Sequence, residues 1–216
     1  DPTVPKHRGI SIVLVPMDAP GLTVKPLKEI VHPDTPDLAE VFLDDVRVPI
    51  ENLVGEENNG WRMANGSLAH ERSMVWLNSV LEVESAMEAL LDRARGWLPA
   101  LGTQERALAA DEVVRLFIET RALRALGYRG FARFVKEGNA PEQALMKAFA
   151  SETRRDLGRV AAEWSGPSAL SATTGRGRVV GSLEDYFSTF ASTISAGSSE
   201  IQRNIIAERI LGLPRD

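Results

Sequence analysis

The first 55 residues alternate short apolar runs with turn-forming residues. Val, Ile and Leu dominate runs at residues 10–15, 22–30, 38–43 and 46–48. Runs of this kind, bounded by proline, glycine and aspartate, are typical of β-strands. Asp44 and Asp45 predict a tight reversal between the last two runs, and Pro49 lacks the amide donor that a strand ladder needs. Since so few strands make neither a sandwich nor a barrel, we expect further strands ahead of Asp1 in the natural protein.

From about residue 56 onward the apolar residues recur at helical spacing. Helical patterns cover residues 61–95, 103–136, 141–164, 183–190 and 199–211. In the second of these, Leu116, Leu123 and Leu126 fall near one stripe, and Gly138 provides a stop signal. Residues 165–182 are rich in serine, threonine and glycine, which predicts a mobile surface loop.

These patterns predict a mainly α protein with a partial antiparallel β region. We place the β region at residues 1–55, as the end of an incomplete domain, and a C-terminal four-helix bundle at residues 56–216. No internal repeat is visible.

Composition and charge narrow the functional classes. A net charge of -5 and a pI near 5.4 argue against a general nucleic-acid-binding protein, which needs clustered positive charge. The sequence has no cysteine and only three scattered histidines, so we expect no metal site. No apolar run approaches the roughly 20 residues that span a bilayer. We expect a cytoplasmic protein, with the mitochondrial matrix as the alternative, because the sequence starts without Met and any targeting signal is not in view.

The segment Ala196–Arg203 combines a flexible glycine with helix-capping residues. Gly197 permits a positive φ angle, Ser198 or Ser199 can cap a helix, and Glu200 suits the positive end of the helix dipole. Amides and hydroxyls at such a helix start also favour an anion, although Glu200 opposes one electrostatically. On local chemistry alone, a well-capped helix is the better interpretation.

The longer string around this segment resembles the C-terminal signature of the acyl-CoA dehydrogenase family. Matching segments occur, in the family's order, at Arg8–Ser11, Val15–Pro16, Pro20–Gly21, Val41–Pro49, Asn52–Gly55, Gly60–Trp61, Ala196–Arg209 and Leu211–Arg215. The resemblance covers nearly the whole chain. It implies the second half of the family's middle β-domain, followed by its complete C-terminal helical domain.

The resemblance also implies an activity and partners. Members of this family are FAD-dependent oxidoreductases of fatty acid or lipid metabolism that oxidise an acyl-CoA thioester to the 2,3-enoyl-CoA and pass electrons to an acceptor such as an electron-transfer flavoprotein. They form dimers or tetramers, here as a homo- or hetero-oligomer. We expect the printed chain to be inactive by itself, because the family's contacts to the flavin ring lie outside it.

The chemistry needs a base to remove the proton next to the thioester carbonyl. Many family members place a glutamate immediately before the glycine of the signature, where this chain has Ala196, which cannot accept a proton. Other members carry the base in a Glu-Arg pair on the first helix of the C-terminal domain, which is Glu71-Arg72 here. By resemblance, Glu71 accepts the α-proton and Arg72 steadies the developing negative charge. An ordinary surface ion pair is the alternative.

Cofactor contacts follow from the resemblance as well. Ser198 and Glu200 stand where the family holds FAD with a hydroxyl residue and often a glutamine, and Gly197 lets the backbone approach. Gly166 matches a glycine near the adenine end of a neighbouring subunit's FAD. The family's Arg-x-x-Phe-Gly motif, whose arginine reaches the FAD pyrophosphate of the adjacent subunit, is missing after the first long helix. Arg93 either replaces that arginine or is simply an exposed arginine near a helix end.

Two alternatives to a catalytic subunit remain. The first alternative is a non-catalytic subunit of the same fold that completes a partner's FAD site. The second is a plain helical interaction module. Five arginines along the second long helix predict a solvated or ion-paired face: Arg115, Arg121, Arg124, Arg129 and Arg133. Binding of a CoA phosphate or of a partner helix by part of this face is the alternative.

Overall fold

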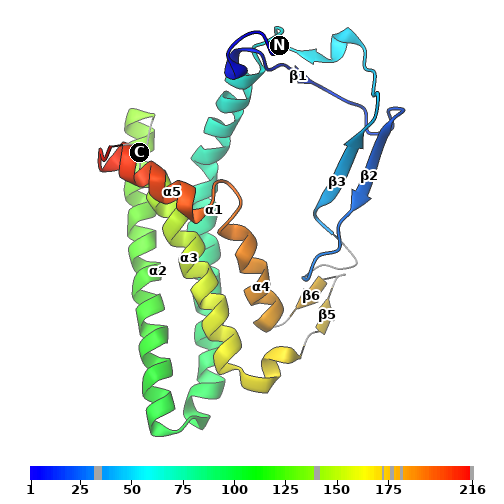
Figure 1. Cartoon of the computed structure of the whole chain (residues 1–216). Helices are drawn as coiled ribbons and strands as arrows, with labels where there is room; N and C mark the ends of the chain where they lie inside the picture. Colours follow the sequence, from blue (N-terminus) through cyan, green and yellow to red (C-terminus); the bar gives the residue numbers. More distant parts are fainter. Residues whose placement is uncertain (32–35, 139–141, 172, 176–177, 181, 215–216) are drawn as a thin grey trace. The chain divides into compact units, whose positions relative to one another are not determined.

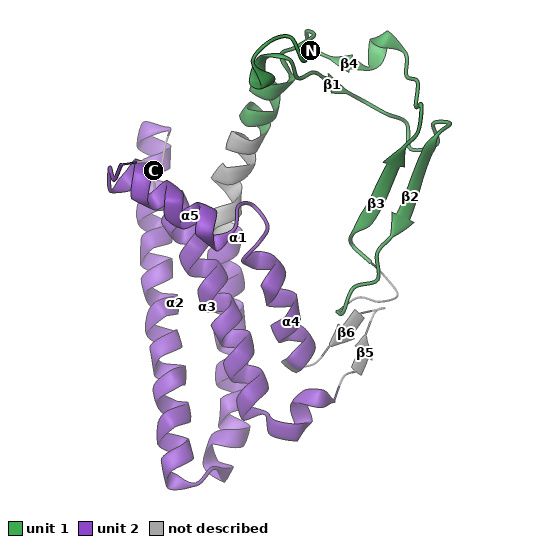
Figure 2. Ribbon diagram, in the orientation of Figure 1, with its two compact units in different colours: residues 1–73 green, residues 74–216 purple. Residues whose placement is uncertain are grey.

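A computed structural model describes the chain over residues 1–31, 36–138, 142–171, 173–175, 178–180 and 182–214, without the side chains of residues 68–77 and 172–182. The fold class predicted from the sequence is confirmed: the chain is mostly helical, with small antiparallel sheets (Figure 1). The chain divides into two compact units, Asp1–Ser73 and Met74–Asp216 (Figure 2). We call them the strand unit and the helical unit.

The strand unit consists of four short strands and two 3-10 turns. Its elements are η1 (Lys6–Arg8), β1 (Ile12–Val13), β2 (Leu22–Pro26), β3 (Ala39–Leu43), η2 (Ile50–Asn52) and β4 (Leu53–Val54). β1 pairs antiparallel with β4, with Ile12 opposite Val54. β2 pairs antiparallel with β3, with Val24 opposite Val41. The unit therefore contains two separate two-stranded ladders rather than one sheet.

The predicted pairing of residues 38–43 with 46–48 is wrong. β3 pairs with β2, and residues 46–48 form no strand. The backbone amide of Asp44 donates to the carbonyl of Gly21 at 2.9 Å, so Asp44 closes the β2–β3 ladder. Asp45 then takes a left-handed conformation, with φ at 49°, and turns the chain away from the ladder. The runs at 10–15 and 22–30 also form shorter strands than predicted.

The helical unit contains most of α1 (Gly60–Trp97) and every later element. These are η3 (Leu98–Ala100), α2 (Thr103–Glu137), α3 (Glu142–Trp164), η4 (Gly166–Leu170), β5 (Thr173–Gly175), β6 (Arg178–Val180), α4 (Ser182–Ser192), α5 (Ser199–Ile205) and the π-helical η5 (Ile206–Ile210). Within this unit α2 packs on α3, and both α4 and α5 pack on α3.

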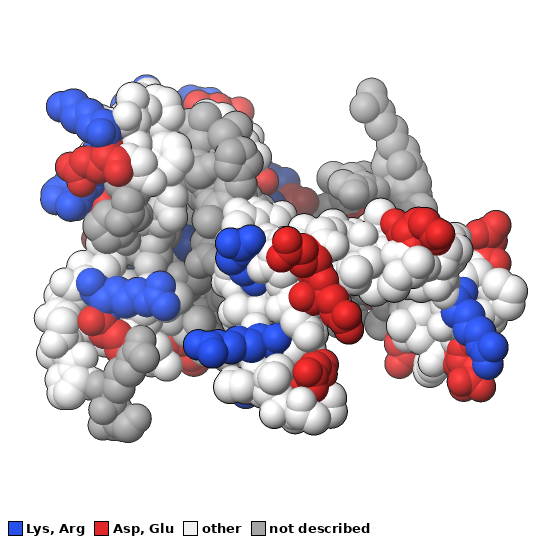
Figure 3. Space-filling model, turned by 90° about the horizontal axis from the view of Figure 1, so that it is seen from above, with Lys and Arg blue, Asp and Glu red and all other residues white. Residues whose placement is uncertain are grey.

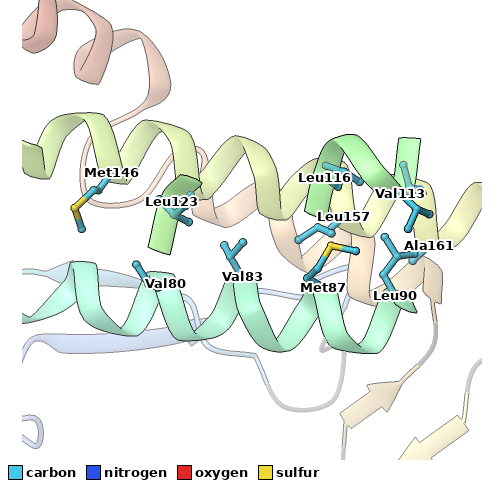
Figure 4. Close-up of a cluster of buried hydrophobic side chains, with 12 residues drawn as sticks. Val80, Val83, Met87, Leu90, Val113, Leu116, Leu123, Met146, Leu157 and Ala161 are labelled. Carbon is cyan, nitrogen blue, oxygen red and sulfur yellow. The ribbon is translucent and has the colours of Figure 1, made fainter. Parts of the chain in front are cut away.

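Side chains from α1, α2 and α3 form the core of the helical unit (Figure 4). Val83 and Leu90 come from α1, Leu116 and Leu123 from α2, and Leu157 from α3, and all five are at most 2% exposed. On α1 and on α2 the two named residues are seven apart, which puts them on one face of the helix. The helical periodicity of the sequence is therefore the periodicity of this core.

Two sequence expectations about the C-terminal third need correction. Residues 165–182, expected to be a loop, contain η4 and the paired strands β5 and β6. Gly166 and Pro167 end α3 but start a 3-10 turn, because proline is tolerated in the first turn of a helix. The last helix is also divided, since α5 ends at Ile205 and η5 continues with wider π-type turns.

Candidate functional site

The signature segment forms the connection from α4 into α5. Ser198 is the N-cap of α5, and its hydroxyl accepts a hydrogen bond from the backbone amide of Ile201 at 3.4 Å. The amide of Ser199 donates to the carbonyl of Thr193 at 3.1 Å, which ties the start of α5 to the end of α4. The predicted capping chemistry of this segment is therefore present, with Ser198 rather than Ser199 in the capping position.

Two consecutive residues of the segment have left-handed backbones. Ala196 has φ at 53° and Gly197 has φ at 96°. The Gln202 side chain donates from Nε2 to the carbonyl of Ala196 at 3.1 Å, and this bond holds the turn. A Cβ at position 197 would lie 2.6 Å from the same Nε2, so the turn requires glycine there. Gln202, which is buried, thus explains why the glycine and glutamine occur together in the signature.

The carboxylate of Glu200 lies at the positive, N-terminal end of α5. The pKa of Glu200 is lowered, first by its own backbone amide and next by the Ser198 hydroxyl. Glu200 is therefore charged at neutral pH and satisfies the positive end of the helix itself. The residues at this helix start do not fit a phosphate group, because a second anion would meet the carboxylate.

Two basic residues attach this region to α3. The ammonium group of Lys147 donates to the carbonyl of Ser192 at 3.0 Å, and burial lowers the pKa of Lys147. Arg203 forms an ion pair with Glu152. Gly158 of α3 allows α4 to approach closely, since a Cβ there would lie 3.0 Å from the Cα of Tyr186. These contacts fix the position of the signature segment relative to α3.

Arg93 is engaged within the chain rather than free for a phosphate. Its guanidinium donates to Asp185 of α4 at 2.9 Å, and the two side chains are 35% and 49% exposed. The contact joins the C-terminal part of α1 to the first turn of α4. Arg93 therefore links two helices, and a cofactor phosphate would have to compete with the Asp185 carboxylate for its guanidinium.

A hollow of about 400 Å³ lies where α3, η4 and α4 meet. Gly166, one of the predicted cofactor residues, is part of its lining. Its other lining residues are mostly apolar: Arg159, Ala162, Glu163, Pro167, Ala169, Leu170, Leu183 and Tyr186. Gly166 has φ at 54°, and no atom lies within 4 Å of where its Cβ would be, so the space beside it is open.

The charged residues of the hollow neutralise each other. Arg159 donates to Glu163 at 2.6 Å and to Glu112 at 3.0 Å. Glu112 also accepts from the Trp164 indole at 2.8 Å. Burial raises the pKa of Glu112, but the bonds from Trp164 and Arg159 outweigh this effect and lower it overall. The hollow therefore fits a flat, uncharged group better than a phosphate.

The two predicted catalytic residues lie outside the part of the structure whose side chains are described. Glu71 and Arg72 fall within the backbone of α1, close to the boundary between the two units. Their assignment as base and charge-stabilising residue stays a prediction.

The remaining candidates separate into two groups at opposite ends of α4. Gly197, Ser198 and Glu200 follow its C-terminal end, whereas Arg93 and the hollow with Gly166 lie at its N-terminal end. The 11 residues of α4 separate the two groups by about 16 Å at a rise of 1.5 Å per residue. The chain thus carries two distinct regions that can contact ligands.

Sequence reasoning missed several residues that shape these regions. Asp185 and Tyr186 belong to no motif, and they come close to Arg93 and Gly166 only through the packing of α4 on α3. The ion pair of Arg159 and Glu163 could have been predicted from the sequence, because opposite charges four residues apart are typical of an exposed helix face.

The predicted ion-paired face of α2 is present. Arg124 and Arg121 lie 3.0 and 3.9 Å from Glu84. Arg129 and Arg133 lie 3.5 and 3.2 Å from Glu142, and Arg115 lies 2.7 Å from Glu119. In Figure 3, basic and acidic side chains are interspersed on the face in view. In the described part of the chain no helix is long and apolar enough to cross a membrane, and no group of acidic and histidine side chains suits a metal ion.

A family model for the C-terminal domain of acyl-CoA dehydrogenases matches residues 58–211. The acyl-CoA dehydrogenase IpdE1 of Mycobacterium tuberculosis is 36% identical over 218 aligned positions, which cover 98% of this chain and 52% of that protein. The chain spans about half the length of this curated relative.

Solved structures give the same fold. A structure described as the Tcur3481-Tcur3483 steroid ACAD matches with a TM-score of 0.81 and 26% identity, covering 100% of this chain and 55% of the other. The ChsE4-ChsE5 complex from Mycobacterium tuberculosis matches with a TM-score of 0.76 and 27% identity, covering 98% and 55%. The second of these is described as a complex of ChsE4 and ChsE5, and the description of the first joins two designations.

Proposed function

Since the chain belongs to the acyl-CoA dehydrogenase family, we propose that it is a subunit of a flavin-dependent enzyme that oxidises an acyl-CoA thioester to the 2,3-enoyl-CoA. The observation that carries this proposal is the match of the family's C-terminal domain over residues 58–211, together with the same fold in solved relatives. The proposal concerns the complete subunit, of which this chain has the length of about half.

Glu71 is the proposed base. Ala196 has no proton-accepting group at the position that many members use, so another carboxylate must accept the α-proton. The FAD cofactor, when bound, supplies the acceptor for the hydride that leaves the neighbouring carbon. Arg72, the next residue of α1, is proposed to stabilise the negative charge that develops on the thioester oxygen.

The hollow beside Gly166 is the region of this chain that best fits part of FAD. Its lining is mainly apolar, its one arginine is paired with its one glutamate, and Tyr186 provides an aromatic wall. Such a lining suits the adenine ring, whose faces are flat and uncharged. Ser198, Glu200 and Gly197 at the start of α5 are proposed to contact the cofactor through hydroxyl and backbone groups, not through phosphate binding, because Glu200 is anionic.

A direct test measures flavin reduction by acyl-CoA without oxygen. The natural full-length subunit, purified with any polypeptide that accompanies it, is mixed with straight-chain and ring-bearing acyl-CoA thioesters. A ring-bearing substrate is included because one similar structure is described as a steroid ACAD. We expect bleaching of the oxidised flavin absorbance, slowed at least 100-fold in Glu71→Gln.

Glu88→Gln is the matched control for that test. Glu88 is an exposed glutamate on the same helix, so its substitution removes an equal charge from α1. We expect the rate of flavin reduction in this variant to stay within about twofold of the parent, a difference of about 0.4 kcal/mol in the barrier. Equal rates in the parent and Glu71→Gln would refute the assignment of the base.

The second candidate function is a non-catalytic subunit that completes a partner's cofactor site. Two observations favour it. One similar structure is described as a complex of two differently named chains, ChsE4 and ChsE5, and Arg93, in place of the family's phosphate-binding motif, is paired with Asp185. If this candidate is correct, flavin copurifies only with the second polypeptide. In that case Glu71→Gln leaves turnover of the assembly unchanged.

A further inference from the structure

Lys147 of α3 holds the main chain at the point where α4 ends and the signature segment begins. Its ammonium group donates a hydrogen bond to the backbone carbonyl of Ser192 at 3.0 Å. Ser192 is the last residue of α4, and Ala196, Gly197 and Ser198 follow it before α5 begins. A side chain of one helix thus binds directly to the backbone that leads into the signature turn.

The carbonyl that Lys147 binds belongs to the C-terminal end of a helix. The last carbonyls of a helix have no partner within it, and they form the negative end of the helix dipole. The amides of Ile194 and Ser195 both donate to the carbonyl of Ala191. Lys147 supplies the donor for the carbonyl that follows, and α4 has no basic residue of its own in its last turn. The positive charge at this helix end therefore comes from α3.

Contacts within the turn fix its shape, whereas Lys147 fixes its place. Gln202 donates from Nε2 to the carbonyl of Ala196 at 3.1 Å. Both residues belong to the segment that runs from the end of α4 into α5, so their bond moves with that segment. Lys147 belongs to α3, and its neighbour Met146 is 1% exposed in the core. A donor on a helix packed in this way can set where the turn lies.

Arg203 is a less effective anchor for the same region. It pairs with Glu152 of α3, but its side chain is 59% exposed, and exposed ion pairs contribute little. The pair also joins two flexible side chains, whereas Lys147 binds the backbone itself. The position of the turn therefore depends chiefly on Lys147.

The charge of Lys147 lowers the stability of the fold where it lies. The side chain is half-buried, and burial lowers its pKa, although the carboxylates of Glu152 and Glu200 act in the opposite direction. A lowered pKa means that folding disfavours the charged form of a lysine. An apolar side chain of similar length would avoid this cost. Stability therefore does not explain the presence of a lysine at this position.

We propose that Lys147 is a positioning residue for cofactor binding: it holds the end of α4 so that Gly197, Ser198 and Glu200 lie where they can contact FAD. This role rests on the proposed function, in which those three residues contact the cofactor. Lys147 acts through the Ser192 carbonyl and does not itself touch FAD.

Amide hydrogen exchange tests the position of the turn independently of flavin chemistry. The natural full-length subunit, purified with any polypeptide that accompanies it, is compared with Lys147→Met, which keeps the length of the side chain and removes the ammonium group. We expect the amides of residues 193–202 to exchange faster by about tenfold or more, because those of Ile194, Ser195 and Ser199 depend on hydrogen bonds of the turn. Amides of α2 near Leu123, which is buried, should exchange at unchanged rates.

The affinity for FAD tests the consequence for the cofactor. After removal and re-addition of flavin, the dissociation constant for FAD should rise by about tenfold or more in Lys147→Met. Lys147→Arg can donate to the same carbonyl and should restore the constant to within about threefold of the parent.

Thermal unfolding of the flavin-free protein separates positioning from stabilisation. The midpoint of Lys147→Met should stay within about 3 °C of the parent, because removal of a buried charge offsets the lost hydrogen bond. A lysine that only stabilised the fold would lower the midpoint instead.

Lys136→Met is the matched control for these measurements. Lys136 is an exposed lysine of α2, so its substitution removes an equal charge without touching α4. Exchange in the turn and the dissociation constant for FAD should both stay within about twofold of the parent.

Equal exchange in the parent and Lys147→Met would overturn the proposal, and so would an unchanged affinity for FAD. Faster exchange over all helices, or loss of folding, would show that Lys147 only stabilises the fold, and it would also overturn the proposal. If the parent takes up no flavin, the proposed function fails, whereas the exchange measurement still decides whether Lys147 fixes the turn.

Discussion

In the helical unit, Leu116, Leu123 and Val160 are completely buried, whereas in the strand unit Val13, Val41 and Leu43 are 42%, 53% and 62% exposed. Every buried apolar side chain among the described residues comes from the helical unit. Apolar runs occur in both units, so the difference lies in how they pack. The helical unit forms a core from its own helices, while the strand unit is organised by backbone pairing in two short ladders.

This difference has a consequence for stability. Burial of apolar area is the main favourable contribution to folding, and two-stranded ladders without a covered face are marginal alone. Unfolding of this chain should therefore report on the helical unit. Within that unit, helix α2 still carries exposed apolar residues, among them Val114 at 55% and Ile118 at 61%.

The largest effect is expected from a cavity in the core of the helical unit. Leu123→Ala removes a side chain that is 0% exposed and packs among α1, α2 and α3. We expect the free energy of unfolding to fall by about 2–5 kcal/mol, as measured by urea denaturation. Leu108→Ala, on the same helix and 64% exposed, is the matched control and should change it by less than about 0.5 kcal/mol. Equal losses in the two variants would contradict the description of this core.

An intermediate effect is expected from the ion pairs of Glu142, which depends on pH. Burial raises the pKa of Glu142, but the backbone amide at the start of α3 and then Arg133 and Arg129 outweigh it, so the pKa is lowered. Because the folded pKa lies below the ordinary value of 4.5, this stabilisation is present above that pH and is lost as the pH falls through the lowered pKa.

Glu142→Gln should therefore lower the free energy of unfolding by about 1–3 kcal/mol at pH 7. The difference from the parent should shrink when denaturation is repeated below pH 4.5. Glu137→Gln is the control, because Glu137 also pairs with Arg133 but its side chain is 57% exposed. A difference that stays constant over this pH range would show that the charge of Glu142 contributes nothing.

The smallest effect is expected in the strand unit. Val41→Thr replaces a half-exposed side chain of β3 that faces Val24 across the ladder and keeps its β-branched shape. We expect the free energy of unfolding to change by less than about 0.5 kcal/mol in the same denaturation experiment. A loss above 1 kcal/mol would show that the strand unit contributes its own core, and the contrast between the two units would fail.

Much of the fold was predictable because its long helices follow a local rule. The boundaries of α2 and α3 lie within a residue or two of those expected, since apolar spacing, Gly138 and Pro141 are local signals. Strand pairing was predicted less well. Asp44 and Asp45 form a bend, but the partner of β3 is β2 and not the run at residues 46–48, and no local pattern identifies such a partner.

The candidate site was predictable only in part. Ser198 caps α5 and Gly197 has a positive φ angle, as their residue types imply. The hollow beside Gly166 was not predictable, because Leu183 and Tyr186 reach it through the docking of α4 on α3. Glu200 stands at the positive end of α5, as its residue type and position imply, and its pKa is lowered there by its own backbone amide.

By itself, the sequence determined the family, the helices and the chemistry available at each position. Ala196 cannot accept a proton in any fold, and the apolar spacing of α2 is helical whatever packs on it. Tertiary structure decided which face of α2 is covered, and that Arg93 pairs with Asp185. The physical reason is range: helix periodicity and capping act over a few residues, whereas burial and ion pairing depend on segments that meet only when the chain has folded.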